Sequence, residues 1–159
     1  MSQNPSFEEL VIKPLSQGDL EEMHRIEELV YTDPWTFNLL EQSLKATMTF
    51  TIGLAETKTN GICKGYAIYQ VIFNEAHLLN IAIHPDIQNR GEGARLLEAV
   101  LSDSRRRGAD SMYLEVRPSN SSAQKLYEKR GFRCLMVREK YYSNGEAAVI
   151  MLCDLKETI

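Results

Sequence analysis

A strand, a glycine-rich turn, a long amphipathic helix and a second strand follow one another over residues 76–117. This order constrains the fold more than any other feature of the chain. The apolar run 76–83 is typical of a strand, and residues 93–107 carry their apolar side chains on one helical face. Two neighbouring strands joined through a helix pair in parallel, because the helix returns the chain to the end where the first strand began. The segment therefore predicts one parallel strand pair.

The remaining strands are expected to pair as hairpins. Runs rich in β-branched and aromatic residues follow one another with short turns between them, which is typical of antiparallel pairing. The predicted strands lie at 10–15, 49–56, 62–73, 76–83, 112–117, 133–142 and 147–155, and the predicted helices at 19–30, 36–46, 93–107 and 120–130. The predicted fold class is α/β in the broad sense that includes α+β proteins. We expect a mixed, mostly antiparallel sheet flanked by about four helices.

The composition is that of a soluble globular protein. The chain has 159 residues, is 43% hydrophobic and 25% charged, and is expected to form a single domain over 1–159. A net charge of -4 argues against a dedicated nucleic-acid binder, which normally carries a basic stripe. The sequence contains neither a long apolar run nor a signal-like start, and its three cysteines are widely spaced. We expect a cytoplasmic monomer that binds neither a membrane nor nucleic acid directly.

The turn at 88–94 has two interpretations. Glycines before a helix N-terminus let backbone N–H groups approach a phosphate, which makes such a turn an anion site. An ordinary strand-to-helix connection would have the same composition. A dinucleotide fingerprint would need a third glycine where Leu96 stands, and the Gly-Lys-Ser/Thr run of a P-loop is absent. Any bound phosphate therefore belongs to another kind of ligand.

Glu115 is the most unusual residue of the strand predicted at 112–117. That strand is apolar and is expected to be covered on both faces, where an unpaired carboxylate is costly. Arg117 lies two residues on, hence on the same side of the strand, and could be a structural partner. The alternative is a carboxylate with a raised pKa that acts as a general base.

Two residues of the following helix are further candidates. Asn120 is placed to cap the helix, and Tyr127 shares an apolar face with Ala123 and Leu126, so on their own they suggest a cap and a core aromatic. The histidines show no metal-ligand spacing. Trp35 follows Asp33-Pro34 and either packs across the break between two helices or lines a binding surface.

Taken together, these residues resemble the GNAT family of acetyl-CoA-dependent N-acetyltransferases. The turn 88–94 is similar to the family's pyrophosphate-binding motif. Within the family, the likeness is greatest to the bacterial enzymes that acetylate the N-terminal alanine of a ribosomal protein. It is carried by residues 80–86, 114–117, 120–132, 138–142 and Pro34-Trp35.

The resemblance implies a layout for the site. The parallel strands would splay and admit the pantetheine arm, with Glu115 as the base for the incoming amine and Tyr127 as the proton donor to the departing thiolate. The amine would attack directly in a ternary complex, without a metal. The implied cofactor-binding residues are Ile81, Ala82, Ile83, Asn89, Arg90, Gly91, Glu92, Gly93, Ala94 and Asn120, and the implied substrate-binding residues are Trp35, Tyr141 and Tyr142.

The implied acceptor is the N-terminal alanine of a small-subunit ribosomal protein. An α-amine has a pKa near 7.7–8.0, so its deprotonation at pH 7 costs roughly 1 kcal/mol, against about 4.6 kcal/mol for lysine. A basic peptide would also suit the acidic helix face expected from Glu21, Glu22, Glu27 and Glu28, although such a face is more simply a solvated one. A small amine such as a polyamine or amino sugar, and a catalytically silent CoA-binding module, are the alternatives.

Three residues depart from the family's pattern. Glu92 places a carboxylate in the phosphate-binding turn, Asp33 replaces an aromatic residue before Pro-Trp, and Ala147 replaces an acidic residue. The change at Glu92 bears on the cofactor, because like charge weakens phosphate binding unless the carboxylate points to solvent. The other two fall in the expected acceptor region.

Overall fold

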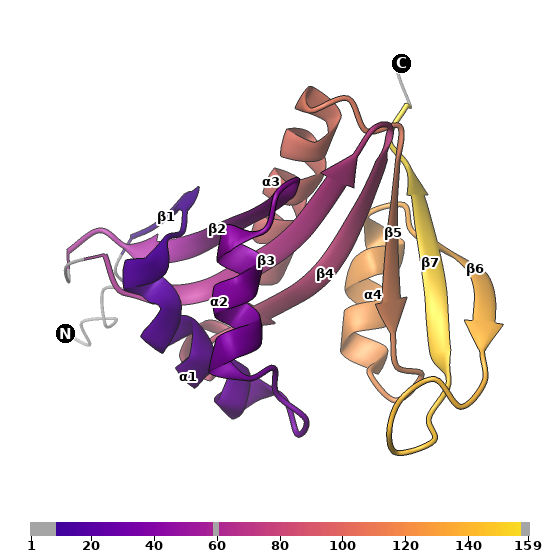
Figure 1. Cartoon of the computed structure of the whole chain (residues 1–159), viewed down its shortest axis with the longest axis horizontal. Coiled ribbons are helices and arrows are strands. Elements are labelled where there is room, and N and C mark those ends of the chain that lie inside the picture. The colour runs from indigo at the N-terminus through magenta and orange to yellow at the C-terminus, as the bar shows by residue number, and fades with distance from the viewer. Residues whose placement is uncertain (1–8, 59–60, 157–159) are drawn as a thin grey trace, which may run out of the picture.

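The computed structural model of the chain describes residues 9–58 and 61–156. Within them, seven strands form one sheet in the order β1-β2-β3-β4-β5-β7-β6 (Figure 1). Only β4 and β5 are parallel; every other neighbouring pair is antiparallel, as expected. The strands are β1 (Leu10–Pro14), β2 (Thr49–Glu56), β3 (Cys63–Ile72), β4 (Glu75–Ile83), β5 (Ser111–Val116), β6 (Arg133–Arg138) and β7 (Ala148–Asp154).

In the described part of the chain, four α-helices cover parts of the two faces of this sheet, which confirms the expected number. They are α1 (Leu20–Val30), α2 (Phe37–Lys45), α3 (Glu92–Arg106) and α4 (Ser121–Lys129), with single 3-10 turns at Gln17–Asp19 and Pro85–Ile87. The first two pack over β2, β3 and β4, while α3 packs on the opposite face and α4 lies on the side of α3 (Figure 1). No helix in the described part of the chain is long and apolar enough to cross a membrane.

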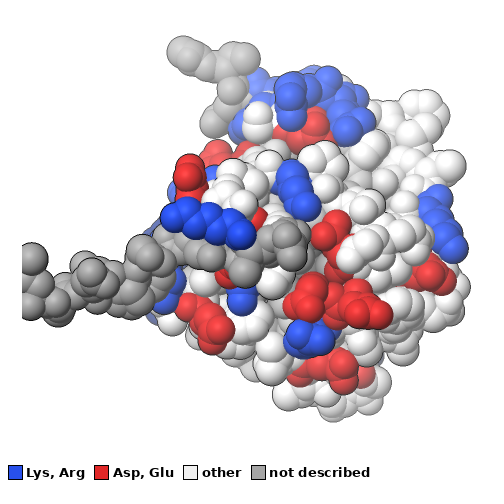
Figure 2. All heavy atoms as spheres, turned by 90° about the vertical axis from the view of Figure 1, so that its left-hand side faces the viewer, with Lys and Arg blue, Asp and Glu red and all other residues white. Residues whose placement is uncertain are grey.

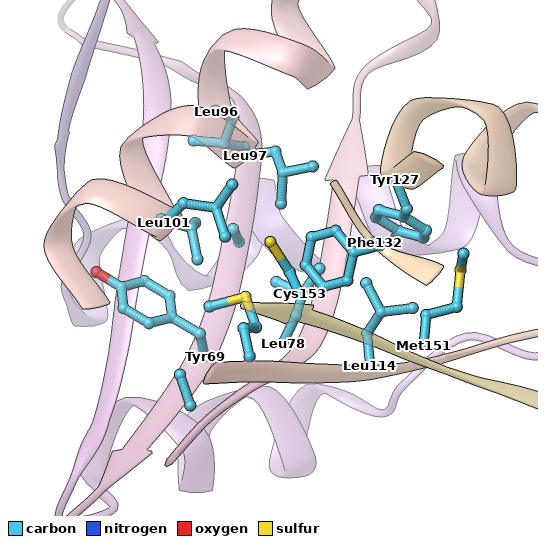
Figure 3. Close-up of a cluster of buried hydrophobic side chains, with 14 of the residues drawn as sticks. Tyr69, Leu78, Leu96, Leu97, Leu101, Leu114, Tyr127, Phe132, Met151 and Cys153 are labelled. Atoms are coloured by element: carbon cyan, nitrogen blue, oxygen red, sulfur yellow. The ribbon is translucent and has the colours of Figure 1, made fainter. Parts of the chain in front are cut away.

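The two faces carry separate hydrophobic cores. Under α3 and α4, leucines of α3 pack with Tyr69, Leu114 and Met151 of the sheet and with Tyr127 of α4 (Figure 3). Under α1 and α2, a smaller core joins Met23 and Ile26 to residues of β3. On the face of β5 and β6 that points away from α4, Glu115 and Met136 are exposed, so among the described residues this face is open.

The parallel pair separates part of the way along its length. Pairing of β4 with β5 runs from Glu75 and Ser111 to Leu78 and Leu114, and then stops. Both strands continue, β4 to Ile83 and β5 to Val116, and Figure 1 shows them diverging. The register of β3 against β4 shifts at the same point, leaving Leu79 as an extra residue. A bulge bends its strand, which accounts for the divergence.

One predicted strand is too long. The strand expected at 133–142 ends at Arg138, because Lys140 adopts a left-handed backbone conformation (φ 53°) that a strand does not tolerate. Tyr141 and Tyr142 therefore lie in the connection between β6 and β7. The strand predicted at 49–56 has the observed bounds, and each of the other predicted elements differs from the observed one by a single residue at one or both ends.

Candidate active site

A cleft of about 300 Å³ opens where β4 and β5 diverge. Six of the predicted catalytic and binding residues line it, from five different segments: Trp35, Ile81, Glu115, Asn120, Tyr127 and Tyr142. The fold thus brings together residues that are up to about a hundred positions apart in the chain. Ala82, Ile83, Tyr141 and the turn 89–94 lie outside the lining of this cleft.

Glu115 is exposed, not buried as its apolar strand suggested. The expectation was wrong because Ser111, Tyr113 and Glu115 alternate onto the open face of β5, whereas Met112, Leu114 and Val116 point into the core. The carboxylate accepts a hydrogen bond of 2.7 Å from the Tyr141 hydroxyl. It is accessible to an incoming amine from the open face.

Arg117 does not serve as the partner of Glu115 in the described structure. Its Nη1 lies 3.3 Å from Glu146 Oε1, and its guanidinium stacks 3.9 Å from the centre of the Tyr142 ring. The Glu146 carboxylate also accepts a 2.9 Å hydrogen bond from the Ser119 backbone N–H, and hydrogen bonds to Ser119 and Arg117 lower the pKa of Glu146. Glu146 therefore fixes the connection bearing the two tyrosines to the end of β5.

Tyr127 is both a core residue and a cleft residue. Its ring packs against Phe132 at a centroid distance of 5.7 Å, and only 6% of the residue is exposed. Burial, and secondarily the nearby Tyr142, raise the pKa of Tyr127 well above its usual range. The hydroxyl stays protonated at any ordinary pH, so it remains a donor at the cleft.

Glu27 lies in the cleft wall and is 1% exposed, so grouping it with the outward-facing glutamates was wrong. Its carboxylate accepts hydrogen bonds from the Trp35 backbone N–H at 3.0 Å, from Asn80 Nδ2 at 2.9 Å and from the Tyr66 hydroxyl. The signal was present in the sequence, because position 27 falls four residues after Met23 and within the buried stripe of α1.

The acidic face expected on α1 therefore has one carboxylate fewer, and two of the remaining three lie beside basic side chains. Glu28 lies 3.3 Å from His24, and Glu22 lies 3.1 Å from Arg25. Figure 2, which faces the β1 side of the molecule, shows acidic and basic side chains interspersed. The solvated-face interpretation fits this surface.

Backbone carbonyls of β4 beyond the bulge are held by side chains and not by β5. The Tyr31 hydroxyl donates to the carbonyl of Ile81, and Gln88 Nε2 donates to that of Ile83 at 2.9 Å. Burial raises the pKa of Tyr31, so this hydroxyl is also a permanent donor. Sequence reasoning missed Tyr31. Pairing with β5 ends at Leu78, so this edge of β4 has no neighbouring strand, and each carbonyl oxygen can accept a second hydrogen bond from an amide-bearing arm.

The glycine-rich turn leads into α3 as an anion site requires. Gly91 is the N-cap residue with a left-handed backbone (φ 81°), and no side chain of the described residues caps this helix. A Cβ at Gly93 would contact Leu126 of α4 at 3.6 Å and Ile83 at 3.8 Å, so the turn lies beside the end of β4. The Glu92 carboxylate is paired with Arg95 at 3.2 Å. The uncapped N–H groups fit a phosphate.

Asn120 caps α4 as predicted, accepting a 3.2 Å hydrogen bond from the Ala123 N–H at the edge of the cleft. Among residues 9–58 and 61–156, no three His, Cys, Asp or Glu side chains are grouped to hold a metal ion. The site thus consists of a carboxylate, buried tyrosine hydroxyls and backbone groups, which suits proton transfer coupled to acyl transfer.

A split parallel pair beside an uncapped glycine-rich helix start is the layout that the family resemblance implied. Residues 18–132 match the acetyltransferase (GNAT) family, and the chain belongs to this family of acyltransferases. The expected fold class and enzyme class are confirmed.

Proteins of several bacteria that are similar to this chain share one name. The chain is 35% identical over 143 residues to [ribosomal protein bS18]-alanine N-acetyltransferase of Escherichia coli, covering 88% of this chain and 94% of that protein. It is 37% identical over 149 residues to the Haemophilus influenzae protein of the same name, covering 91% and 99%. The crystal structure of the Escherichia coli ribosomal-protein-alanine N-acetyltransferase superposes with a TM-score of 0.85 at 32% identity, covering 95% of this chain and 97% of that one.

Substituting Glu27→Ala should destabilise the protein by about 3 kcal/mol or more, because it leaves two buried donors and one part-buried donor without an acceptor. Glu28→Ala is the matched control on the same helix; its carboxylate is 59% exposed, and the change should stay within about 0.5 kcal/mol. Urea unfolding of the two variants measures both. A Glu27 variant whose free energy of unfolding also stays within about 0.5 kcal/mol of the native value would show that these hydrogen bonds contribute nothing to stability.

Proposed function

We propose that this chain transfers the acetyl group of acetyl-CoA to the α-amine of the N-terminal alanine of ribosomal protein bS18. The observation that carries the proposal is the position of Glu115 and Tyr127, an accessible carboxylate and a buried hydroxyl that line one cleft. The similar proteins of two bacteria are named for this reaction, which supports the same acceptor here.

The cosubstrate would bind along the divergence of β4 and β5. The backbone of Ile81, Ala82 and Ile83 would hold the pantetheine arm, as would Asn120 near the cleft. The turn from Asn89 through Arg90, Gly91, Glu92 and Gly93 to Ala94 would hold the pyrophosphate at the α3 N-terminus. Acetyl-CoA supplies the thioester. The Glu92 carboxylate is paired with Arg95, which offsets its negative charge. Glu92 would therefore weaken phosphate binding less than expected from the sequence.

Glu115 would accept the proton of the incoming amine. The amine nitrogen then forms a bond to the thioester carbon, the carbon–sulfur bond breaks, and Tyr127 donates to the departing sulfur. A carboxylate suffices as base because the α-amine has a pKa near 7.7–8.0, so little free energy is needed to deprotonate it at neutral pH. A buried tyrosine suits the donor role because its raised pKa keeps the proton in place until sulfur charge develops.

Trp35, Tyr141 and Tyr142 would form the acceptor pocket. Trp35 and Tyr142 line the cleft, and Tyr141 holds the Glu115 carboxylate from its open side. The pocket is built from two connections, and Glu27 and Glu146 tether them to the sheet through the hydrogen bonds described above. A tethered aromatic pocket would position a small N-terminal side chain beside Glu115.

Thiol release from acetyl-CoA tests the function directly. We expect turnover with a peptide that begins Ala-Arg-Tyr and has a free α-amine, and none with the same peptide N-blocked. Polyamines, amino sugars and lysine-bearing blocked peptides serve as controls. Turnover only with small amines would show that the acceptor is a small amine and not a peptide. If the protein binds acetyl-CoA but turns over none of these acceptors, it is a CoA-binding module.

Substituting Glu115→Gln should lower kcat about 100-fold or more, because it removes the base without changing side-chain size. The Kd for acetyl-CoA, measured by calorimetry, should stay within about twofold. Glu128→Gln, on the exposed face of α4, is the isosteric control and should leave both quantities unchanged. Undiminished turnover of the Glu115 variant would remove this residue from the mechanism.

Tyr127→Phe should lower kcat about 10-fold to 100-fold while the free energy of unfolding changes little, because the ring contact with Phe132 survives. Tyr69→Phe is the matched comparison: its hydroxyl donates to Asp103 at 2.5 Å, far from the cleft. That variant should lose stability and keep its turnover. The opposite pattern would make Tyr127 a core residue only.

A further inference from the structure

A second hollow of about 300 Å³ lies on the open face of the sheet, and Glu115 is the one residue of its lining that has a role in the proposed chemistry. All the residues that line it belong to the strands β4, β5, β6 and β7; those used below are His77, Tyr113, Glu115, Leu135, Met136 and Ile150. We call this hollow the strand groove.

The register of the sheet explains how the strand groove forms. Glu115 lies opposite Ile150, and Ile150 lies opposite Met136, so the three side chains form one row across β5, β7 and β6. Tyr113 lies two residues before Glu115 on the same face and stacks with His77 at a centroid distance of 5.4 Å. The alternate residues of these strands point toward α4 instead.

The strand groove leaves large apolar side chains in contact with water. Met136 is 48% exposed and Leu135 is 49% exposed, and the irregular register between Cys134 and Met136 makes Leu135 an extra residue of the strand. Together with the Tyr113 ring, these side chains form an apolar and aromatic floor. Such a surface favours a partner that carries apolar or aromatic side chains.

Glu115 lines both the cleft and the strand groove. An amine that reaches Glu115 arrives across the open face, because the glycine-rich turn contacts α4 on the opposite side of the sheet. We propose that the strand groove binds the part of the acceptor polypeptide that follows the acetylated residue, as an extended segment with apolar or aromatic side chains. The inference rests on the proposed function and adds to it the region that recognises the acceptor.

The position of Glu115 favours an extended chain over a second copy of this protein. Glu115 is the last residue of β5 that lines the strand groove, so a folded partner seated on the groove would cover the candidate base. An extended N-terminal segment can fill the groove and still present its amine to Glu115. At about 3.3 Å per residue, a few residues of extended chain suffice to span the row of strands.

Acceptor length separates groove binding from the chemistry. We would compare kcat/KM for two free-amine peptides with the same first three residues, one ending there and one extended to about twelve residues with the bS18 sequence. The native protein should prefer the longer peptide by about 10-fold or more, equivalent to about 1.4 kcal/mol of additional binding.

Met136→Lys should abolish most of this length preference and leave kcat/KM for the short peptide within about twofold. Val137→Lys is the matched control: Val137 is also 48% exposed and adjacent in sequence, but it pairs with Val149 and points to the other face of β6. It should change neither value, and circular dichroism would establish that both variants fold.

The other outcomes overturn the proposal in distinguishable ways. If the native protein turns over both peptides without a length preference, the proposed role of the strand groove is refuted and the proposed enzymatic activity is retained. Equal losses from Met136→Lys and Val137→Lys would mean a general effect on β6. A native dimer that Met136→Lys dissociates in sedimentation would assign the face to a second copy. Turnover of neither peptide would refute the proposed function, and the groove proposal with it.

Discussion

The bulge at Leu79 is the feature on which the site depends. Before it, Ala76 and Leu78 point to the core under α3; after it, Ile81 packs on that core while Asn80 and Ala82 face α1. The single extra residue thus exchanges the two faces of β4 and ends its pairing with β5 in the same step. The divergence leaves the Ile81 and Ile83 carbonyls to side-chain donors and opens the cleft between the strands.

The exchange of faces also determines what the cleft wall contains. It turns Asn80 toward α1, where its side-chain amide donates to Glu27, and the same carboxylate holds the backbone of Trp35. A buried carboxylate of this kind is tolerated because neutral hydrogen-bond donors surround it. Without the carboxylate, each of these donors would lack an acceptor. The connection after α1 is therefore fixed to β4 by one side chain, at the place where the acceptor amine is proposed to bind.

Local patterns predicted the parts of this molecule that depend on a few neighbouring residues. The apolar face of α3 and the cap at Asn120 are of this kind, and both are present. The exposure of Glu115 could not be predicted in the same way, since it depends on whether a helix from elsewhere covers β5. The turn at Lys140 and the buried position of Glu27 likewise depend on what the rest of the fold places beside them.

The two faces of the split sheet favour different ligands. On the α3 and α4 side lie an uncapped helix N-terminus and a glycine turn, which favour an anionic ligand. On the other side lie the exposed Glu115 carboxylate and the apolar row that continues to Met136. A polyanionic cosubstrate and a cationic amine have opposite charges. The helix N-terminus that attracts the first and the carboxylate that attracts the second therefore lie on opposite faces of the sheet. Under this arrangement the two ligands meet only at the gap that the bulge creates, which fits direct transfer between them within a ternary complex.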